Sequence, residues 1–155
     1  MGRLIHQAMP RSHITKLKQS KPLHGLFLDD RRHPSGVEWC NRLMDGNKAD
    51  INWHRATTFN EAVAVVTSAI HMNRIITYMS IDYNLSPLED AKTGHDFLHW
   101  LHQRVGDGLD GTQPLVPLDK ERFTINIHSG NLTTLTAMDT LVEGIYRMLR
   151  EDSRP

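Results

Sequence analysis

The chain has a single cysteine, no formal net charge and no long apolar run, and each scarcity excludes a class of protein. Because Cys40 has no second cysteine to pair with, an intramolecular disulfide is excluded and a reducing, cytoplasmic setting is expected. No stretch is apolar enough to cross a bilayer, and the first residues lack the apolar core of a secretion signal. The balanced charge predicts no general attraction to nucleic acid or membrane. These absences predict a cytoplasmic globular protein.

The charge is balanced overall but not locally. Residues 1–22 contain five Lys and Arg side chains and no acidic one. Two roles fit such a segment, a solvated arm or an arm that contacts phosphate. We therefore predict a basic N-terminal arm over residues 1–22 and one α/β domain over residues 23–155.

Two apolar segments end in acidic residues. Residues 23–28 are followed by Asp29 and Asp30, and residues 75–81 are followed by Asp82. Apolar runs of this length are typical of buried strands in a parallel sheet, where ligands bind at the carboxyl ends of the strands. Clustered carboxylates repel one another, and a hard cation such as Mg²⁺ or Mn²⁺ would keep them ionised together. An Asp-Asp pair after a strand is also common turn chemistry, so both interpretations stay open.

Helical patterns alternate with strand patterns along the rest of the chain. Further strands are expected near 51–56 and 122–129, helices near 35–46, 58–70, 94–105 and 132–150, and a long loop over 106–120. Alternation of this kind favours right-handed crossovers and a parallel sheet. We predict a three-layer, flavodoxin-like α/β fold with four strands in the order 2-1-3-4 and no fifth strand. The last strand alternates apolar and polar residues, which predicts one less-covered face.

Three polar residues near the predicted acidic edge have two possible roles each. Arg32 could form an ion pair with Asp82 or clamp a phosphate. Ser129 could cap the last helix or help its N-terminus hold a phosphoryl oxygen. His128 could act as a general acid or base near neutral pH if the chain turns there, and it is otherwise a packed or solvent-facing histidine.

The same residues resemble those of response-regulator receiver domains. In that family the first acidic pair, here Asp29 and Asp30, binds Mg²⁺, and the Asp after the third strand, here Asp82, accepts a phosphoryl group. Ser129 is similar to the receiver Ser/Thr on the fourth strand. The lysine that receivers carry on a fifth strand has no counterpart, because the chain ends after one more helix.

A closer resemblance is to the cyclic-phosphate processing receiver domain family. It covers roughly residues 23–147, and its motifs occur in the same order: Leu26-Phe27-Leu28-Asp29-Asp30-x-Arg32-x-Pro34, Trp53, Arg55-Ala56-Thr57, Ser80-Ile81-Asp82, Gly94-His95-Asp96, Trp100-Leu101 and His128-Ser129-x-Asn131. Asn84 stands where family members often carry a second Asp. The resemblance implies a receiver-like fold and the binding or hydrolysis of a cyclic phosphate, at an RNA end or in a cyclic nucleotide.

Three functions follow from these observations. The first is a metal-dependent phosphoesterase in which Asp29, Asp30 and Asp82 hold Mg²⁺ or Mn²⁺. In this hypothesis Asp82 and His128 are catalytic, His128 protonates the leaving oxygen, and the phosphate-orienting residues are Arg32, Ser129 and Asn131. The second is a non-catalytic binding module, as in many small phage or mobile-element proteins, that docks a nucleotide, or a protein at the open sheet edge. The third is a phosphoacceptor receiver with Asp82 as nucleophile.

Overall fold

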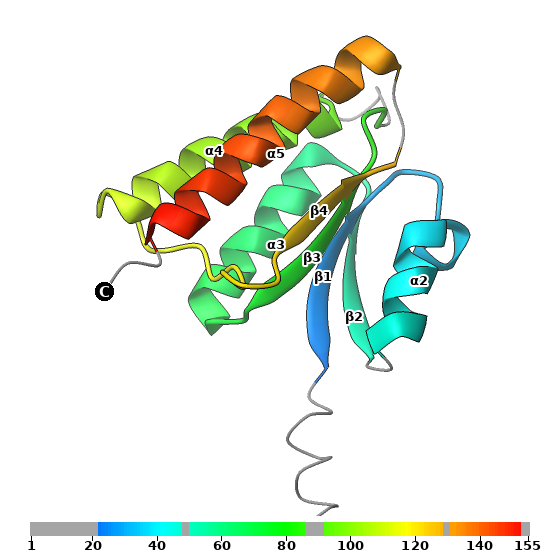
Figure 1. Cartoon of the computed structure of the whole chain (residues 1–155), viewed down its shortest axis with the longest axis horizontal. Helices are drawn as coiled ribbons and strands as arrows, with labels where there is room; N and C mark the ends of the chain where they lie inside the picture. Colours follow the sequence, from blue (N-terminus) through cyan, green and yellow to red (C-terminus); the bar gives the residue numbers. More distant parts are fainter. Residues whose placement is uncertain (1–21, 48–49, 86–91, 129–130, 153–155) are drawn as a thin grey trace, which may run out of the picture.

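The computed structural model describes residues 22–47, 50–85, 92–128 and 131–152. Its elements in chain order are β1 (Leu23–Leu28), the 3-10 turn η1 (Pro34–Gly36), α2 (Glu38–Asn47), β2 (Ile51–Ala56), α3 (Phe59–Met72), β3 (Ile76–Ile81), α4 (Gly94–Leu109), β4 (Thr124–Ile127) and α5 (Leu132–Asp152) (Figure 1). No helix among these residues is long and apolar enough to span a bilayer.

The four described strands form one parallel sheet in the order β2-β1-β3-β4, which confirms the predicted topology. The register aligns the carboxyl ends of three neighbouring strands. Leu28 of β1 pairs with Ile81 of β3, and Ile81 pairs with Ile127 of β4. The residue that follows each of these strands therefore lies at one edge of the sheet.

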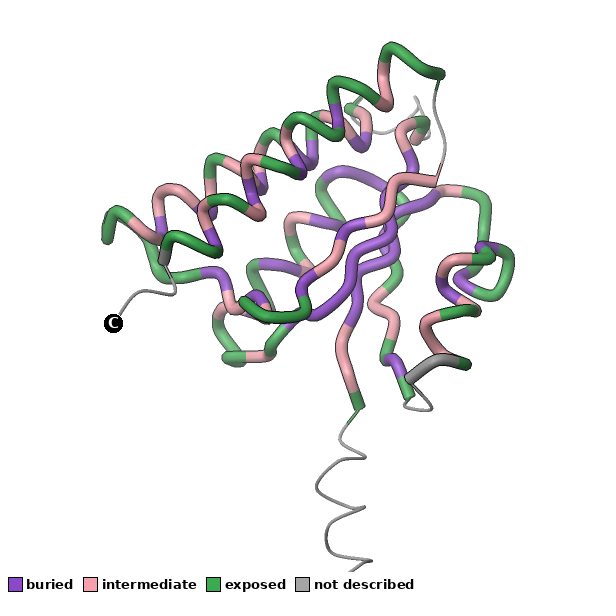
Figure 2. The backbone as a smooth tube through the Cα atoms, in the orientation of Figure 1, coloured by how far each residue is buried: buried purple, intermediate pink, exposed green. Residues whose placement is uncertain are grey.

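The sheet separates two cores of unequal size. Leu26 and Leu28 face a large core shared with α3, α4 and α5, whereas Phe27 faces a small core with Val37 and Cys40 on the side of α2. Figure 1 shows α2 apart from the other three helices, and α5 packs along α4. β3 is buried throughout, β1 is buried from Gly25 to Leu28, and β4 is buried only in part (Figure 2). The predicted three layers are therefore present, and β4 has the expected less-covered face.

The outer edge of β4 is partly covered by the chain itself. The backbone N–H of Ile125 donates a hydrogen bond of 2.8 Å to the hydroxyl of Tyr146 on α5. A paired N–H group cannot pair with an added strand, so this contact opposes edge-to-edge association at that position.

The long loop begins later than expected, because α4 continues through Leu109 rather than ending near Val105. Gly108 lies in this extension of the helix. A Cβ at this position would lie 3.2 Å from the Cα of Leu115 and from the carbonyl oxygen of Pro114, so glycine lets the returning chain pack directly on the helix. Arg104 secures that chain by donating a 2.7 Å hydrogen bond from Nη2 to the Pro114 carbonyl.

Helix starts follow side-chain capping, with one exception. Thr58 accepts a 3.1 Å hydrogen bond from the N–H of Glu61, as its Thr-x-x-Glu spacing predicts. A reciprocal capping box joins Thr93 and Asp96 at the start of α4. The helix expected from residue 35 begins instead at Glu38, because Pro34–Gly36 form a 3-10 turn.

Candidate metal and phosphate site

The Asp29 carboxylate is wholly buried at the end of β1. Its Oδ1 accepts hydrogen bonds from the backbone N–H groups of Arg31 at 2.7 Å and Arg32 at 2.9 Å, which turn the chain away from the strand. Burial pushes the pKa of Asp29 upward, but these hydrogen bonds and one from His128 outweigh it and lower the pKa. Asp29 is therefore ionised in the folded protein at neutral pH.

Asp82 holds the equivalent place after β3 and is only 4% exposed. Its backbone N–H donates to the Leu28 carbonyl at 2.8 Å, and its Oδ1 accepts a 3.2 Å hydrogen bond from the N–H of Asn84. Burial and the charge of Asp29 raise the pKa of Asp82 to about 6, although the Asn84 N–H and Arg32 act in the opposite direction. The two adjoining carboxyl groups therefore have very different affinities for a proton.

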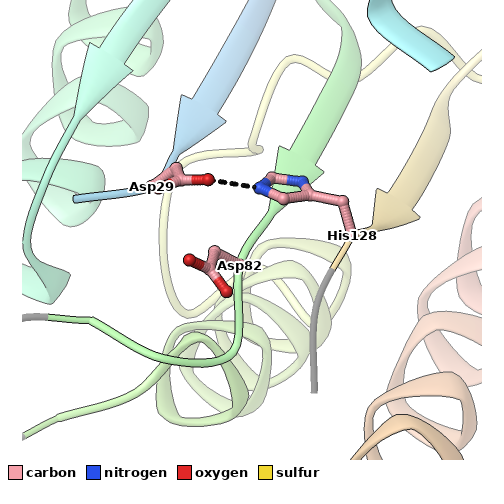
Figure 3. Close-up of side chains that lie close together, drawn as sticks. All are labelled: Asp29, Asp82 and His128. Atoms are coloured by element: carbon pink, nitrogen blue, oxygen red, sulfur yellow. Dashed lines mark hydrogen bonds and ion pairs between the residues drawn. The ribbon is translucent and has the colours of Figure 1, made fainter. Parts of the chain in front are cut away.

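His128 joins the two carboxylates from the end of β4. Its backbone N–H donates to the Ile81 carbonyl at 3.0 Å, which keeps the residue in line with the strand. Nε2 lies 2.8 Å from Asp29 Oδ2 (Figure 3). Nδ1 lies 2.8 Å from Ser80 Oγ. The ring stacks on Phe27 with a centroid distance of 5.4 Å. His128 therefore lies on the α2 face of the sheet and points toward the acidic edge.

The protonation of His128 follows from this environment. Its side chain is only 5% exposed, and burial lowers its pKa although the Asp29 carboxylate raises it. We therefore assign a neutral imidazole in which Nε2–H donates to Asp29 and Nδ1 accepts from the Ser80 hydroxyl.

Asp29, Asp82 and His128 each offer one ligand atom, and these atoms all lie within 4.8 Å of one another. Figure 3 shows the three side chains converging from three strands. The set fits a divalent cation, because two buried carboxylates repel each other and a bound cation would relieve that repulsion. Asp30 is not among the three residues of this cluster, so its expected role as a ligand stays a prediction.

The other predicted site residues lie around this cluster. Arg32 donates from Nη1 to the His128 carbonyl at 3.1 Å, and its Nε is 3.8 Å from Asp29 Oδ2. Asn131 caps α5, since its Oδ1 accepts a 2.9 Å hydrogen bond from the N–H of Thr134. Ser129 lies outside the described residues. Arg55, for which no role was predicted, donates from Nη2 to the Arg32 carbonyl at 2.9 Å and so supports the turn that carries Arg32.

Gly94 lets α4 begin directly against Asp82. A Cβ at Gly94 would lie 2.1 Å from the carbonyl oxygen of Asp82 and 2.9 Å from Cγ2 of Ile81. We expect Gly94→Ala to lower the free energy of unfolding by about 3 kcal/mol, measured by urea denaturation, because backbone must move to admit the methyl group.

Gly106 provides a matched control in the same helix, because the nearest atom to an added Cβ there is Met148 Sδ at 3.6 Å. Gly106→Ala should be neutral or stabilising by about 0.5–1 kcal/mol. Equal effects of the two substitutions would show that the contact with Asp82 is not what requires glycine.

A large cavity among the described residues lies elsewhere, at the amino-terminal ends of β1 and β3. It measures about 1220 Å³, and its walls include His24, Arg74, Ile75 and Leu118. The acidic cluster is thus an edge site rather than the floor of this cavity, and we place the chemistry at the cluster because the titratable groups converge there.

Residues 24–144 match the family model described as "Cyclic-phosphate processing Receiver domain". The matched region contains Asp29, Asp82 and His128, as well as all four strands from His24 onward. No curated protein and no solved structure matches the chain.

Proposed function

The chain belongs to the cyclic-phosphate processing receiver domain family, and on this premise we propose that it is a metal-dependent phosphoesterase that hydrolyses a cyclic phosphate. The observation that carries the proposal is the convergence of three potential ligand atoms within 4.8 Å at the carboxyl edge of the sheet. In the reaction, water adds to phosphorus and one P–O ester bond of the ring breaks. The products are a phosphomonoester and a free hydroxyl.

We assign Asp29, Asp82 and His128 as the residues that hold the metal. When bound, a divalent cation would polarise a phosphoryl oxygen and lower the pKa of a water molecule. The donor set contains an imidazole, which suits first-row transition ions better than Mg²⁺, whereas carboxylates suit Mg²⁺ and Mn²⁺ alike. Of the two ions expected from the sequence, Mn²⁺ therefore fits this donor set better.

His128 is better placed as a ligand than as the proton donor expected from the sequence. Both of its ring nitrogens already have partners, Asp29 on Nε2 and Ser80 on Nδ1. Proton donation to a leaving oxygen would require Nε2 to leave Asp29. Metal binding would also replace this hydrogen bond, but the ring could stay where it is, with a nitrogen within 4.8 Å of a ligand atom of each carboxyl group.

Arg32 is the described cation best placed to orient the phosphate. Its side chain is 46% exposed and lies next to the cluster, where its guanidinium contacts the His128 carbonyl. A planar guanidinium can donate two parallel hydrogen bonds to a phosphate. Asn131 at the start of α5 and Ser129 remain proposed phosphate contacts, since a helix N-terminus favours anions.

The experiment is an assay of ring opening with nucleoside 2′,3′-cyclic phosphates, 3′,5′-cyclic nucleotides and an RNA that ends in a 2′,3′-cyclic phosphate. We expect ³¹P NMR to reveal conversion of at least one substrate to a phosphomonoester with Mn²⁺, and none with chelator. Asp82→Asn should be inactive. Asp110→Asn makes the same chemical change at an exposed residue that follows α4, and this control variant should retain activity.

Two results would contradict the proposal. Absence of turnover for all three substrates with Mn²⁺ would exclude hydrolysis of these cyclic phosphates, and binding without turnover would favour the binding-module hypothesis. Full activity in chelator would exclude a role for the metal.

The binding-module hypothesis in which a protein docks at the open sheet edge has less support, because the Tyr146 hydroxyl already accepts a hydrogen bond from the N–H of Ile125 on β4.

A further inference from the structure

Ser80 lies behind the cluster of Asp29, Asp82 and His128. Its side chain would contact neither the metal nor the substrate. It is wholly buried on β3, two residues before Asp82. Its hydroxyl lies 2.8 Å from Nδ1 of His128 on one side, and on the other it lies close enough to the Cys40 thiol to oppose the rise in pKa that burial gives that group. A chain of polar groups therefore runs from Cys40 through Ser80 and His128 to Asp29.

The ring of His128 cannot bind a metal through Nε2 in the tautomer that the metal-free protein requires. In that state Nε2 carries the proton that it donates to Asp29 Oδ2 at 2.8 Å. A metal needs the lone pair of Nε2, so the neutral ring must carry its proton on Nδ1 instead. The group facing Nδ1 must then change from donor to acceptor.

A hydroxyl is suited to this change because it can donate one hydrogen bond and accept two. Without metal, the Ser80 O–H donates to Nδ1 and the Cys40 S–H is available to donate to Ser80 Oγ. With metal, Nδ1–H donates to Ser80 Oγ, and the Ser80 O–H can turn toward the Cys40 sulfur. This reversal moves hydrogen atoms only, and it leaves no charge buried without a partner.

We propose that Ser80 is a positioning residue that holds the His128 ring in place and, by reversing its hydrogen bond, lets Nε2 become a metal ligand. This inference rests on the proposed metal site. It adds a residue that the site needs although the residue contacts neither metal nor substrate. The stacking of His128 on Phe27 fixes the plane of the ring, and Ser80 then fixes which nitrogen faces the carboxylates.

The test uses Zn²⁺, a diamagnetic ion, with the full chain. Long-range ¹H–¹⁵N spectra of the histidine rings distinguish the two neutral tautomers. We expect wild-type His128 to be protonated on Nε2 in chelator and on Nδ1 when Zn²⁺ is bound. Ser80→Ala should weaken Zn²⁺ binding about 10- to 100-fold, as loss of a hydrogen-bond partner of a ligating histidine typically does.

Two further variants separate this role from general packing. Ser80→Thr keeps the hydroxyl and should restore most of the affinity. Thr77→Val removes another buried hydroxyl from β3 at the opposite end of the strand, and it should leave Zn²⁺ affinity unchanged. Urea denaturation of each variant in chelator shows whether it is folded.

The possible failures are distinguishable. Wild-type affinity and a normal tautomer change in Ser80→Ala would overturn the role of Ser80 while leaving the metal site intact. Equal losses in Ser80→Ala and Thr77→Val would also overturn it, because they would indicate a packing effect. Absence of Zn²⁺ binding in the wild type would overturn the proposed metal site and this inference together.

Discussion

Asp82→Asn is expected to stabilise the metal-free protein at about pH 8 and, at the same time, to abolish its binding of Mn²⁺. Burial and the nearby charge of Asp29 raise the pKa of Asp82 to about 6. Above that pH the carboxyl group is ionised in both the folded and the unfolded states, and ionisation opposes folding by on the order of 3 kcal/mol. A neutral amide removes this cost but offers a much weaker ligand.

The size of this effect depends on pH in a defined way. Because the folded-state pKa is raised above the unfolded one, the cost is complete above about pH 6 and absent below the unfolded pKa near 3.8. The advantage of Asp82→Asn should therefore shrink to about half near pH 5 and disappear near pH 3.5. Urea denaturation in chelator over this pH range measures it.

Asp110→Asn is the matched control, since the same chemical change at an exposed helix end should alter stability by less than about 0.5 kcal/mol at any of these pH values. A destabilised Asp82→Asn at about pH 8 would mean that the two carboxylates do not oppose each other in the folded state. Retained Mn²⁺ binding in the same variant would remove Asp82 from the site.

Asp29→Ala is expected to have the opposite effect on stability, with a loss of about 3–5 kcal/mol. The buried Asp29 carboxylate accepts hydrogen bonds from the backbone of Arg31 and Arg32 and from His128, and all three donors would lose their partner. Relief of repulsion with Asp82 offsets only part of this loss. For a domain of ordinary stability, the change is a large fraction of the total.

Asp29→Asn should cost less than Asp29→Ala, because a side-chain oxygen can still accept from the backbone of Arg31 and Arg32. Urea denaturation of both variants in chelator at about pH 7 gives the comparison. A cost below about 1 kcal/mol for Asp29→Ala would contradict the structural role of this carboxylate. Neither variant should bind Mn²⁺ as the wild type does.

The strand ends of the site were predictable, because short apolar runs followed by Asp29 and Asp82 indicate buried parallel strands. The 2-1-3-4 order then places both residues at one edge, as the structure confirms. The sequence alone could not show which of the adjacent residues Asp29 and Asp30 contributes its carboxylate to the cluster. Only the turn in which Asp29 Oδ1 binds two backbone N–H groups determines which of the two adjacent carboxylates stays at the strand end.

The orientation of His128 depended on information that spacing does not contain. Whether it faced the site rested on whether the chain turned after the last strand. In the structure β4 ends at Ile127, yet His128 stays in line through its hydrogen bond with Ile81 and points along the face that carries Phe27 and Ser80. The contact with Ser80 joins positions 48 residues apart, and it follows from the register of β3 and β4 rather than from any local motif.

The most direct measurement is the anomalous difference density of a crystal grown with saturating Mn²⁺. We expect one peak bounded by carboxylate oxygens of Asp29 and Asp82 and by Nε2 of His128, with the hydrogen bond between His128 and Asp29 replaced by bonds to the ion. Absence of a peak there, with that 2.8 Å hydrogen bond intact at saturating Mn²⁺, would contradict the metal site on which the proposed chemistry depends.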